Sequence, residues 1–280
     1  DVVQVCFFVY KLDLPFSDKK NQKVINQFKD VENELRGLVL DKRYDWILER
    51  ASLLIKDILK GCDPREILPK HGPGSVATGE KLHEKWAFSR KYEALHRVYP
   101  YYEYFVPSRA SLLDRISWYK SLESLESGCA KVALVPKDSR GPRLISMEPL
   151  EYQFIQQGLK TKLYKRLESH PLTRGRLNFT DQSINQNLAV SSSRLGDYST
   201  LDMKEASDRV SLQLVKRLFS KTPDWLRSLE ASRSTHTELP DGTKLELLKF
   251  APMGSAVCFP IEALVFWSIG EVLRREWLVK

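Results

Sequence analysis

The sequence predicts an α+β protein, and three observations support this. Between residues 21 and 60, apolar side chains recur at three- and four-residue steps, as in amphipathic helices. Between residues 131 and 146, two short apolar segments flank a turn that contains Gly141 and Pro142, which predicts a hairpin. From residue 198 onward the patterns follow the order strand, helix, hairpin, helix. The N-terminal third is therefore mainly helical and the remainder is mixed.

Composition narrows the functional class. The 280 residues include 44 Lys and Arg against 36 Asp and Glu, a net charge of +8 that favours polyanionic partners. The longest apolar stretch, 263–269, is far too short to span a membrane, and no signal segment opens the chain. The four cysteines are too widely spaced for a zinc ribbon or a disulfide scaffold. We therefore expect a soluble, unsecreted protein with no membrane partner.

The predicted hairpin at 131–146 is strongly basic. The segment 131–176 carries ten basic and four acidic residues, which is +6 of the net +8. Lys137, Arg140 and Arg143 surround the turn and could grip a triphosphate through charge-assisted hydrogen bonds. The alternative is an ordinary solvated basic surface. After the hairpin, Pro149 can open a helix whose inward stripe is Leu150, Phe154, Leu159 and Leu163.

Two carboxylates lie around the next predicted junction. Residues 198–203 have the pattern of a strand, and a helix follows whose apolar face is Val210, Leu214, Val215, Leu218 and Phe219. Asp202 falls at the end of the strand and Asp208 near the start of the helix, so both could face one site. A carboxylate beyond a strand end can bind Mg²⁺. Alternatively, Asp208 caps the helix and Asp202 is a surface turn residue.

The last third predicts a hairpin and a glycine-containing loop. Pro240 and Gly242 mark a turn at 239–243 between extended segments. Gly254 and Ser255 lie in the loop 251–256, ahead of a helix opened by Pro260. Glycine there would let the backbone approach a ligand closely, and the helix N-terminus could bind an anion. An ordinary turn would explain the same residues.

Taken in order, these segments resemble the RNA-directed RNA polymerase (replicase) of the leviviruses, the single-stranded RNA bacteriophages, and more loosely their narnavirus-like relatives. The resemblance runs from about His71 to the end of the chain. It implies a right-hand polymerase fold, with fingers at 71–195, an incomplete palm at 196–280 and a helix-rich N-terminal region at 1–70 that is placed by position alone. The segments that carry it are His71-Gly72-Pro73-Gly74-Ser75 with Lys85-Trp86, 135–149, Asp181-Gln182 with Asn185-Gln186, 202–208, and 253–266.

The resemblance also implies roles for residues. Lys137 and Arg143 would contact the phosphates of the incoming nucleotide, as in the fingers motif F. Asp202 would be the catalytic, metal-binding aspartate of motif A, with Mg²⁺ as the ion and Mn²⁺ as an alternative. Asp208 would accept a hydrogen bond from the ribose 2′-OH.

The loop with Gly254 and Ser255 resembles motif B, which supports template and sugar. The phage pattern often has Asn after the glycine, so Ser255 is a departure from it.

One departure is larger. The family has a Gly-Asp-Asp turn, motif C, after motif B, and no Asp-Asp pair occurs in these 280 residues. A single carboxylate cannot clamp two ions about 3.5–4 Å apart. We therefore interpret the chain as truncated before motif C and expect it to be inactive alone, with the rest of the palm and the thumb following Lys280.

The predicted function is template-directed nucleotidyl transfer to an RNA 3′-OH during replication of a viral RNA genome. The expected partners are template and product RNA and ribonucleoside triphosphates, in the cytoplasm of a bacterial host. Some members of the family bind host elongation factors Tu and Ts. One alternative is a non-catalytic RNA-binding module. Another is a reverse transcriptase-like palm, which is less favoured because that family typically has Gln-Gly where this chain has Met253-Gly254.

Overall fold

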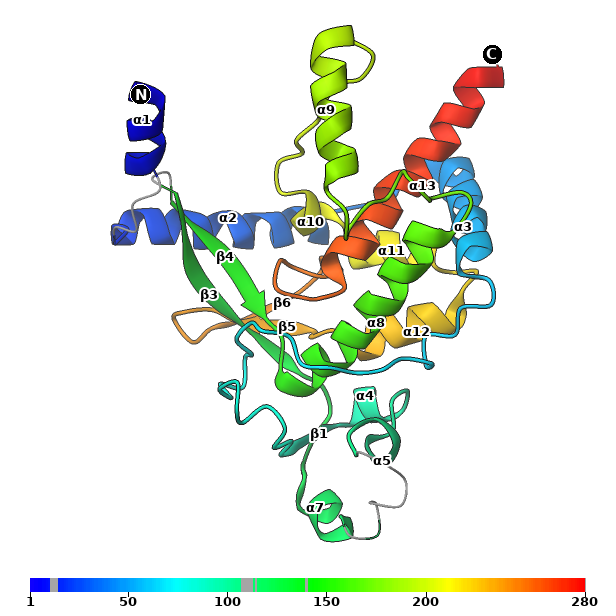
Figure 1. The fold of residues 1–280 in the computed structure, drawn as a ribbon. Helices are drawn as coiled ribbons and strands as arrows, with labels where there is room; N and C mark the ends of the chain where they lie inside the picture. The colour runs from blue at the N-terminus through cyan, green and yellow to red at the C-terminus, as the bar shows by residue number, and fades with distance from the viewer. Residues whose placement is uncertain (11–14, 107–112, 114, 139–140, 280) are drawn as a thin grey trace.

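The computed structural model describes residues 1–10, 15–106, 113, 115–138 and 141–279 and mixes helices with two small sheets (Figure 1), so the predicted α+β class is confirmed. The helices are α1 Val2–Tyr10, α2 Asp18–Arg36, the 3₁₀ turn η1 Lys42–Tyr44, α3 Asp45–Leu59, α4 Glu93–His96, α5 Tyr101–Tyr104, α7 Ile116–Ser121, α8 Leu150–Ser169, α9 Ser183–Leu195, α10 Ala206–Arg209, α11 Leu212–Leu218, α12 Pro223–Ala231 and α13 Cys258–Val279. The strands are β1 Arg90–Tyr92, β2 Glu123–Leu125, β3 Cys129–Asp138, β4 Gly141–Met147, β5 His236–Glu238 and β6 Lys244–Glu246.

The central sheet has the strand order β4-β3-β5-β6. Strands β3 and β4 form the predicted basic hairpin, β5 and β6 form the second predicted hairpin, and β3 joins the two by pairing parallel to β5. Gly242 adopts a φ of 83° in the second turn, which few other residues tolerate. Helix α2 packs against β4, where Phe28 enters a small apolar cluster with Val132 (Figure 1). The two hairpins and α2 thus form one packed unit.

The main core lies among α3, α8, α11 and α13. Leu150, Phe154, Leu159 and Leu163 of α8 are buried, as their spacing predicts. The same apolar cluster contains residues from Ile47 in α3 to residue 272 in α13. Consequently the regions predicted at 1–70, 71–195 and 196–280 share one core, while the boundaries between them stay a prediction.

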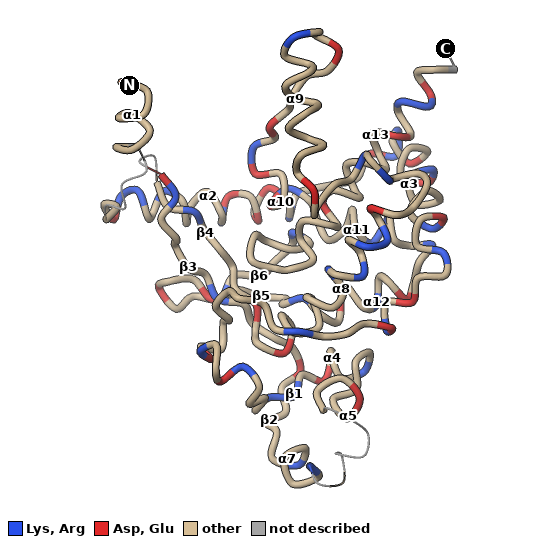
Figure 2. Tube along the Cα trace, viewed as in Figure 1, with Lys and Arg blue, Asp and Glu red and all other residues tan. Residues whose placement is uncertain are grey.

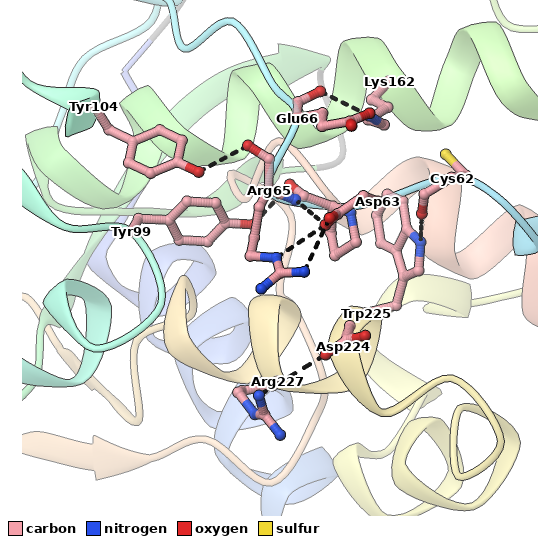
Figure 3. A network of polar contacts seen from close by, with 11 residues as sticks. Cys62, Asp63, Arg65, Glu66, Tyr99, Tyr104, Lys162, Asp224, Trp225 and Arg227 are labelled. Atoms are coloured by element: carbon pink, nitrogen blue, oxygen red, sulfur yellow. Dashed lines mark hydrogen bonds and ion pairs between the residues drawn. The ribbon is translucent and has the colours of Figure 1, made fainter.

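Polar contacts hold residues 62–66, the irregular segment that follows α3 (Figure 3). The indole Nε1 of Trp225, on α12, donates a 2.7 Å hydrogen bond to the carbonyl of Cys62. The hydroxyl of Tyr99 donates to the carbonyl of Pro64 at 3.1 Å. Because these buried donors satisfy backbone carbonyls of an irregular segment, the segment is held between α12 and the residues around α5.

The predicted strand at 198–203 is wrong. These residues have no regular structure and descend from α9 toward α10 (Figure 1). Tyr198 is 71% and Leu201 85% exposed. A strand needs a neighbour to pair its N–H and C=O groups, and within the described ranges this segment has none. The segment 198–203 therefore has no strand to pair with among the described residues.

The helix predicted after Asp208 is split into α10 and α11. Ser211 interrupts it, because its hydroxyl accepts a 3.0 Å hydrogen bond from the backbone N–H of Leu214 and caps α11. Val210, Val215, Leu218 and Phe219 are buried as predicted. In the described part of the chain no helix is both long and apolar enough to cross a membrane.

Candidate functional site

The loop before α13 lies directly on strand β4. The backbone N–H of Ser146 donates a 2.8 Å hydrogen bond to the carbonyl of Met253. Gly254 has a φ of 124°, and a Cβ at that position would lie 2.2 Å from the carbonyl oxygen of Ser146. The sequence predicts a close backbone approach here, and the structure shows that the neighbour is the backbone of β4. Only glycine fits between the loop and the basic hairpin.

Ser255 attaches the same loop to α8. Its hydroxyl donates to Oε1 of Gln156 at 3.1 Å, and the N–H of Ala256 donates to the same oxygen at 3.0 Å. The amide nitrogen of Gln156 donates in turn to the carbonyl of Ser232 at 2.6 Å. Ser255 is only 7% exposed. Its hydroxyl therefore holds the loop in place, between β4 on one side and α8 on the other.

Asp208 faces a buried lysine. The ammonium of Lys249 lies 3.1 Å from Oδ1 of Asp208 and 3.4 Å from Oε1 of Glu32, which comes from α2. Lys249 and Glu32 are fully buried, and the Asp208 side chain is 25% exposed. Burial raises the pKa of Glu32, while the charge of Lys249 opposes that shift. A buried charge must be paired. The ammonium of Lys249 is paired with the carboxylates of Glu32 and Asp208, and we call these three residues the Asp208 cluster.

Backbone pairing brings Asp208 close to the glycine loop. The N–H of Leu212 donates to the carbonyl of Leu248 at 2.8 Å, and the N–H of Phe250 donates to the carbonyl of Val210 at 2.7 Å. This short antiparallel contact sets α10 beside the segment that leads into Gly254. Helix α10 also packs against α13. The structure thus gathers Asp208, Gly254, Ser255 and the end of β4 in one neighbourhood.

Lys137 and Arg143 lie farther out on the hairpin. Both are exposed, and Arg143 pairs with Val135 in the β3–β4 ladder. Arg143 is three residues from Ser146, about 10 Å along an extended strand. Neither cation makes an ion pair with another described residue. Arg140, the third predicted contact, lies outside the described residues. Lys137 and Arg143 therefore stand exposed on the hairpin whose strand β4 meets Gly254.

No hydrogen bond or ion pair between described residues joins Asp202 to this neighbourhood. Asp202 is exposed, and it makes no hydrogen bond or ion pair with the residues that the structure describes. Nearby, residues 198–200 line a hollow against α9 and α13, whereas Lys204 and Glu205 face α2. Over the described ranges, no group of three or more His, Cys, Asp or Glu side chains is arranged to hold a metal ion. The residues present do not by themselves form the predicted metal site.

Sequence reasoning missed the buried partners of the site. Lys249, Glu32 and Gln156 were not candidates. Lys249 had one signal, because it stands in the otherwise apolar run 247–251. A lysine in such a run is either exposed by a turn or buried with a partner, and here it is buried.

Comparison with known proteins identifies the family. The family model described as RNA replicase, beta-chain, matches residues 46–275. The chain belongs to this replicase family. The match begins at residue 46, so α3 belongs to it as well, although the sequence motifs place the resemblance only from His71 onward.

Curated relatives agree with the replicase family. The RNA-directed RNA polymerase subunit beta of Enterobacteria phage SP is 31% identical over 199 residues, which are 70% of this chain and 32% of that protein. The subunit of the same name from Qbeta virus (strain MX1) is 29% identical over 81% of this chain and 37% of its own length. The RNA-directed RNA polymerase beta chain of Escherichia phage MS2 is 33% identical over 49% of this chain and 24% of its own length. The predicted resemblance to levivirus replicases is confirmed, and the matched part is 24% to 37% of the length of these relatives.

Proposed function

We propose that this chain is part of an RNA-directed RNA polymerase that copies a viral RNA genome. The reaction would transfer a nucleotide to the 3′-OH of an RNA chain, with pyrophosphate as the leaving group. The observation that carries the proposal is the replicase family match over residues 46–275. The clustering of Asp208, Gly254 and Ser255 against the strand that carries Arg143 supports it.

In this proposal the chain has a right-hand polymerase fold, with fingers at 71–195 and part of the palm at 196–280. Lys137 and Arg143 bind the triphosphate, since both are exposed, neither forms an ion pair with another described residue, and such cations suit phosphate oxygens. Asp208 accepts the ribose 2′-OH with the oxygen that does not face Lys249. Gly254 and Ser255 hold the loop that supports template and sugar.

Asp202 is proposed as one ligand of a divalent ion, Mg²⁺ or alternatively Mn²⁺. Hard oxygen ligands suit Mg²⁺, which keeps much of its shell for water and phosphate. The described residues do not complete such a site, so the remaining carboxylates would come from outside the described ranges. The contribution of this chain's own described side chains is therefore binding and positioning.

The proposed partners are template RNA, product RNA and ribonucleoside triphosphates, and the proposed place of action is the cytoplasm of an infected bacterium. The named relatives are proteins of bacterial viruses. Host elongation factors Tu and Ts are proposed as partners only because of the resemblance to levivirus replicases. No residues of this chain are proposed to bind them.

A second candidate function is a non-catalytic RNA-binding module. It is favoured by the sequence, which has a basic hairpin but no Asp-Asp pair. Primer extension separates the two. The 280-residue chain should bind RNA without extending a primer, and the replicase that carries this chain should extend one in a manner that depends on Asp202. If that replicase incorporates no nucleotide, the polymerase proposal is contradicted and the RNA-binding module is the function that remains.

A further inference from the structure

A hollow of about 850 Å³ lies between α9 and the C-terminal half of α13, away from the cluster around Asp208. Its lining includes Arg176, Arg274 and Tyr198. Helices α9 and α13 project on the same side of the molecule, and the 198–200 segment descends beside α9 (Figure 1). The hollow is therefore an open groove with cationic and aromatic walls.

A buried carboxylate holds the guanidinium groups of the groove in place. Glu271, whose side chain is 5% exposed, accepts hydrogen bonds from Nη1 of Arg176 at 3.1 Å, from Nε and Nη2 of Arg274 at 2.8 Å each, and from Nε of Arg275 at 2.8 Å. Hydrogen bonds and charge from Arg274, and then from Arg275, hold the pKa of Glu271 down to about 2, so it stays ionised. The three arginine side chains remain 48–51% exposed. Of the three, Arg176 and Arg274 line the groove together with Glu271, so two guanidinium groups face one carboxylate there. Basic and acidic residues both mark the C-terminal part of α13 (Figure 2).

The rest of the lining is neutral and mixes apolar side chains, such as Leu188 and Trp267, with side chains that form hydrogen bonds. Apart from Glu271, no acidic residue is among the described residues that line the groove. Tyr198 is 71% exposed, so its ring is accessible. The amide and hydroxyl side chains of the lining are Asn178, Asn185, Ser192, Ser199 and Thr200. Arginine donors suit phosphates, amides suit base edges, and an exposed aromatic ring offers a stacking surface for an unpaired base.

We propose that the groove between α9 and α13 binds single-stranded RNA, with phosphates on Arg176 and Arg274 and a base stacked on Tyr198. The inference deepens the proposed function, because RNA is the substrate which that function names. It concerns a surface separate from the Asp208 cluster, and it assigns a role to the exposed segment 198–200.

The test is RNA binding by the 280-residue chain itself, measured by fluorescence anisotropy with a labelled oligouridylate of about 16 nucleotides over a range of salt concentrations. The double variant Arg176→Ala/Arg274→Ala should lose about tenfold or more in affinity at low salt. The slope of log Kd against log salt should fall in magnitude by roughly 1 to 1.5, because about 0.7 counterion is released per phosphate contact on a single strand.

The matched control is Arg97→Ala/Arg227→Ala. These two exposed arginines also pair with carboxylates, Glu126 and Asp224, and line a different hollow that contains acidic residues. The control changes the net charge by the same amount as the groove variant, but its two arginines lie outside the groove. Its RNA affinity should therefore stay within about twofold of that of the unsubstituted chain, with an unchanged salt slope. Equal losses in both double variants would mean general attraction to a basic protein and would overturn the proposal.

Two further variants keep the test decisive if the loss of both arginines unfolds the region around Glu271. Ser192→Glu adds a negative charge to the groove without touching the arginines, and it should weaken RNA binding to a similar degree. Tyr198→Ala should weaken binding about fivefold or more with little change in salt slope, as loss of a stacked base predicts. Tyr44→Ala, at a 53% exposed tyrosine elsewhere, is its control.

Unchanged affinity in both Ser192→Glu and Tyr198→Ala would contradict the proposal, and so would equally tight binding of a polyglutamate of similar length, which would indicate an acidic protein partner. These results are independent of catalysis. A replicase that fails to extend primers while the groove variants behave as expected would contradict the proposed function and leave the groove assignment standing.

Discussion

Lys249 places its ammonium 3.1 Å from Oδ1 of Asp208, although the lysine is completely buried. The same ammonium lies 3.6 Å from the centre of the Phe28 ring and 3.4 Å from Glu32, both on α2. Helix α2, which lies in the region placed by position alone, thus holds Lys249, and Lys249 in turn holds the carboxylate of Asp208 in the candidate nucleotide site. The orientation of Asp208 depends on contacts that span more than two hundred residues of sequence.

The first prediction concerns this buried cation. Lys249→Met should destabilise the fold by about 3–5 kcal/mol, because it leaves Glu32 buried without a counter-charge. Urea unfolding at pH 7 measures the change. Lys216→Met removes an exposed lysine that is paired with Glu230 at 2.8 Å, and it should cost less than about 1 kcal/mol. Equal losses in the free energy of unfolding from the two substitutions would show that the buried lysine stabilises the fold no more than an exposed one.

The second prediction concerns Glu151, which is fully buried on α8. Neither of its carboxylate oxygens makes a hydrogen bond of normal geometry within the described part of the chain. Burial raises its pKa from 4.5 to about 7. Since the folded state favours the protonated form, the contribution of this group to stability is complete below about pH 4.5 and is lost as pH rises through about 7.

Glu151→Gln should therefore stabilise the protein by up to about 3 kcal/mol at pH 8 and have little effect at pH 4. Unfolding midpoints of the two proteins, measured from pH 4 to pH 8, test this. A difference that is constant over that range would contradict the assigned pKa direction.

The third prediction concerns the contact between the loop and β4. Gly254→Ala should cost about 2 kcal/mol or more, because the backbone has a φ of 124° and the new Cβ would meet the carbonyl of Ser146. Gly270→Ala is the control, since a Cβ there meets no atom within 4 Å and the site is helical. That substitution should be neutral or stabilising by up to about 1 kcal/mol. Thermal unfolding of both variants gives the comparison.

The fourth prediction concerns the basic hairpin. Lys137→Ala/Arg143→Ala should leave the unfolding midpoint unchanged, since both side chains are exposed. In the replicase that carries this chain, it should raise the KM for nucleotides about tenfold or more, because charge-assisted hydrogen bonds to the triphosphate are lost. Lys131→Ala is a suitable control, as that exposed lysine pairs with Glu238 on the same sheet. Unchanged kinetics would make the hairpin an ordinary solvated surface.

Sequence reasoning succeeded where the signal was local. Apolar spacing predicted α2, α3, α8 and α13, and Gly242 and Gly254 stand where their conformations require glycine. It failed at 198–203, because a strand exists only if another strand pairs with it, and the local sequence of a segment does not identify that partner. Lys249 was missed for a related reason. Its partners Glu32 and Asp208 lie far away in sequence, and no short motif joins them.

The proposal that Asp202 is a metal ligand has the most direct test. Primer extension by the replicase that carries this chain should fall by about a thousandfold or more in Asp202→Asn, since a metal ligand contributes several kcal/mol to transition-state stabilisation. RNA binding should stay nearly unchanged. Asp197→Asn, at another exposed aspartate of the same segment, should extend primers normally. Extension by Asp202→Asn at the rate of the unsubstituted enzyme would contradict the assignment.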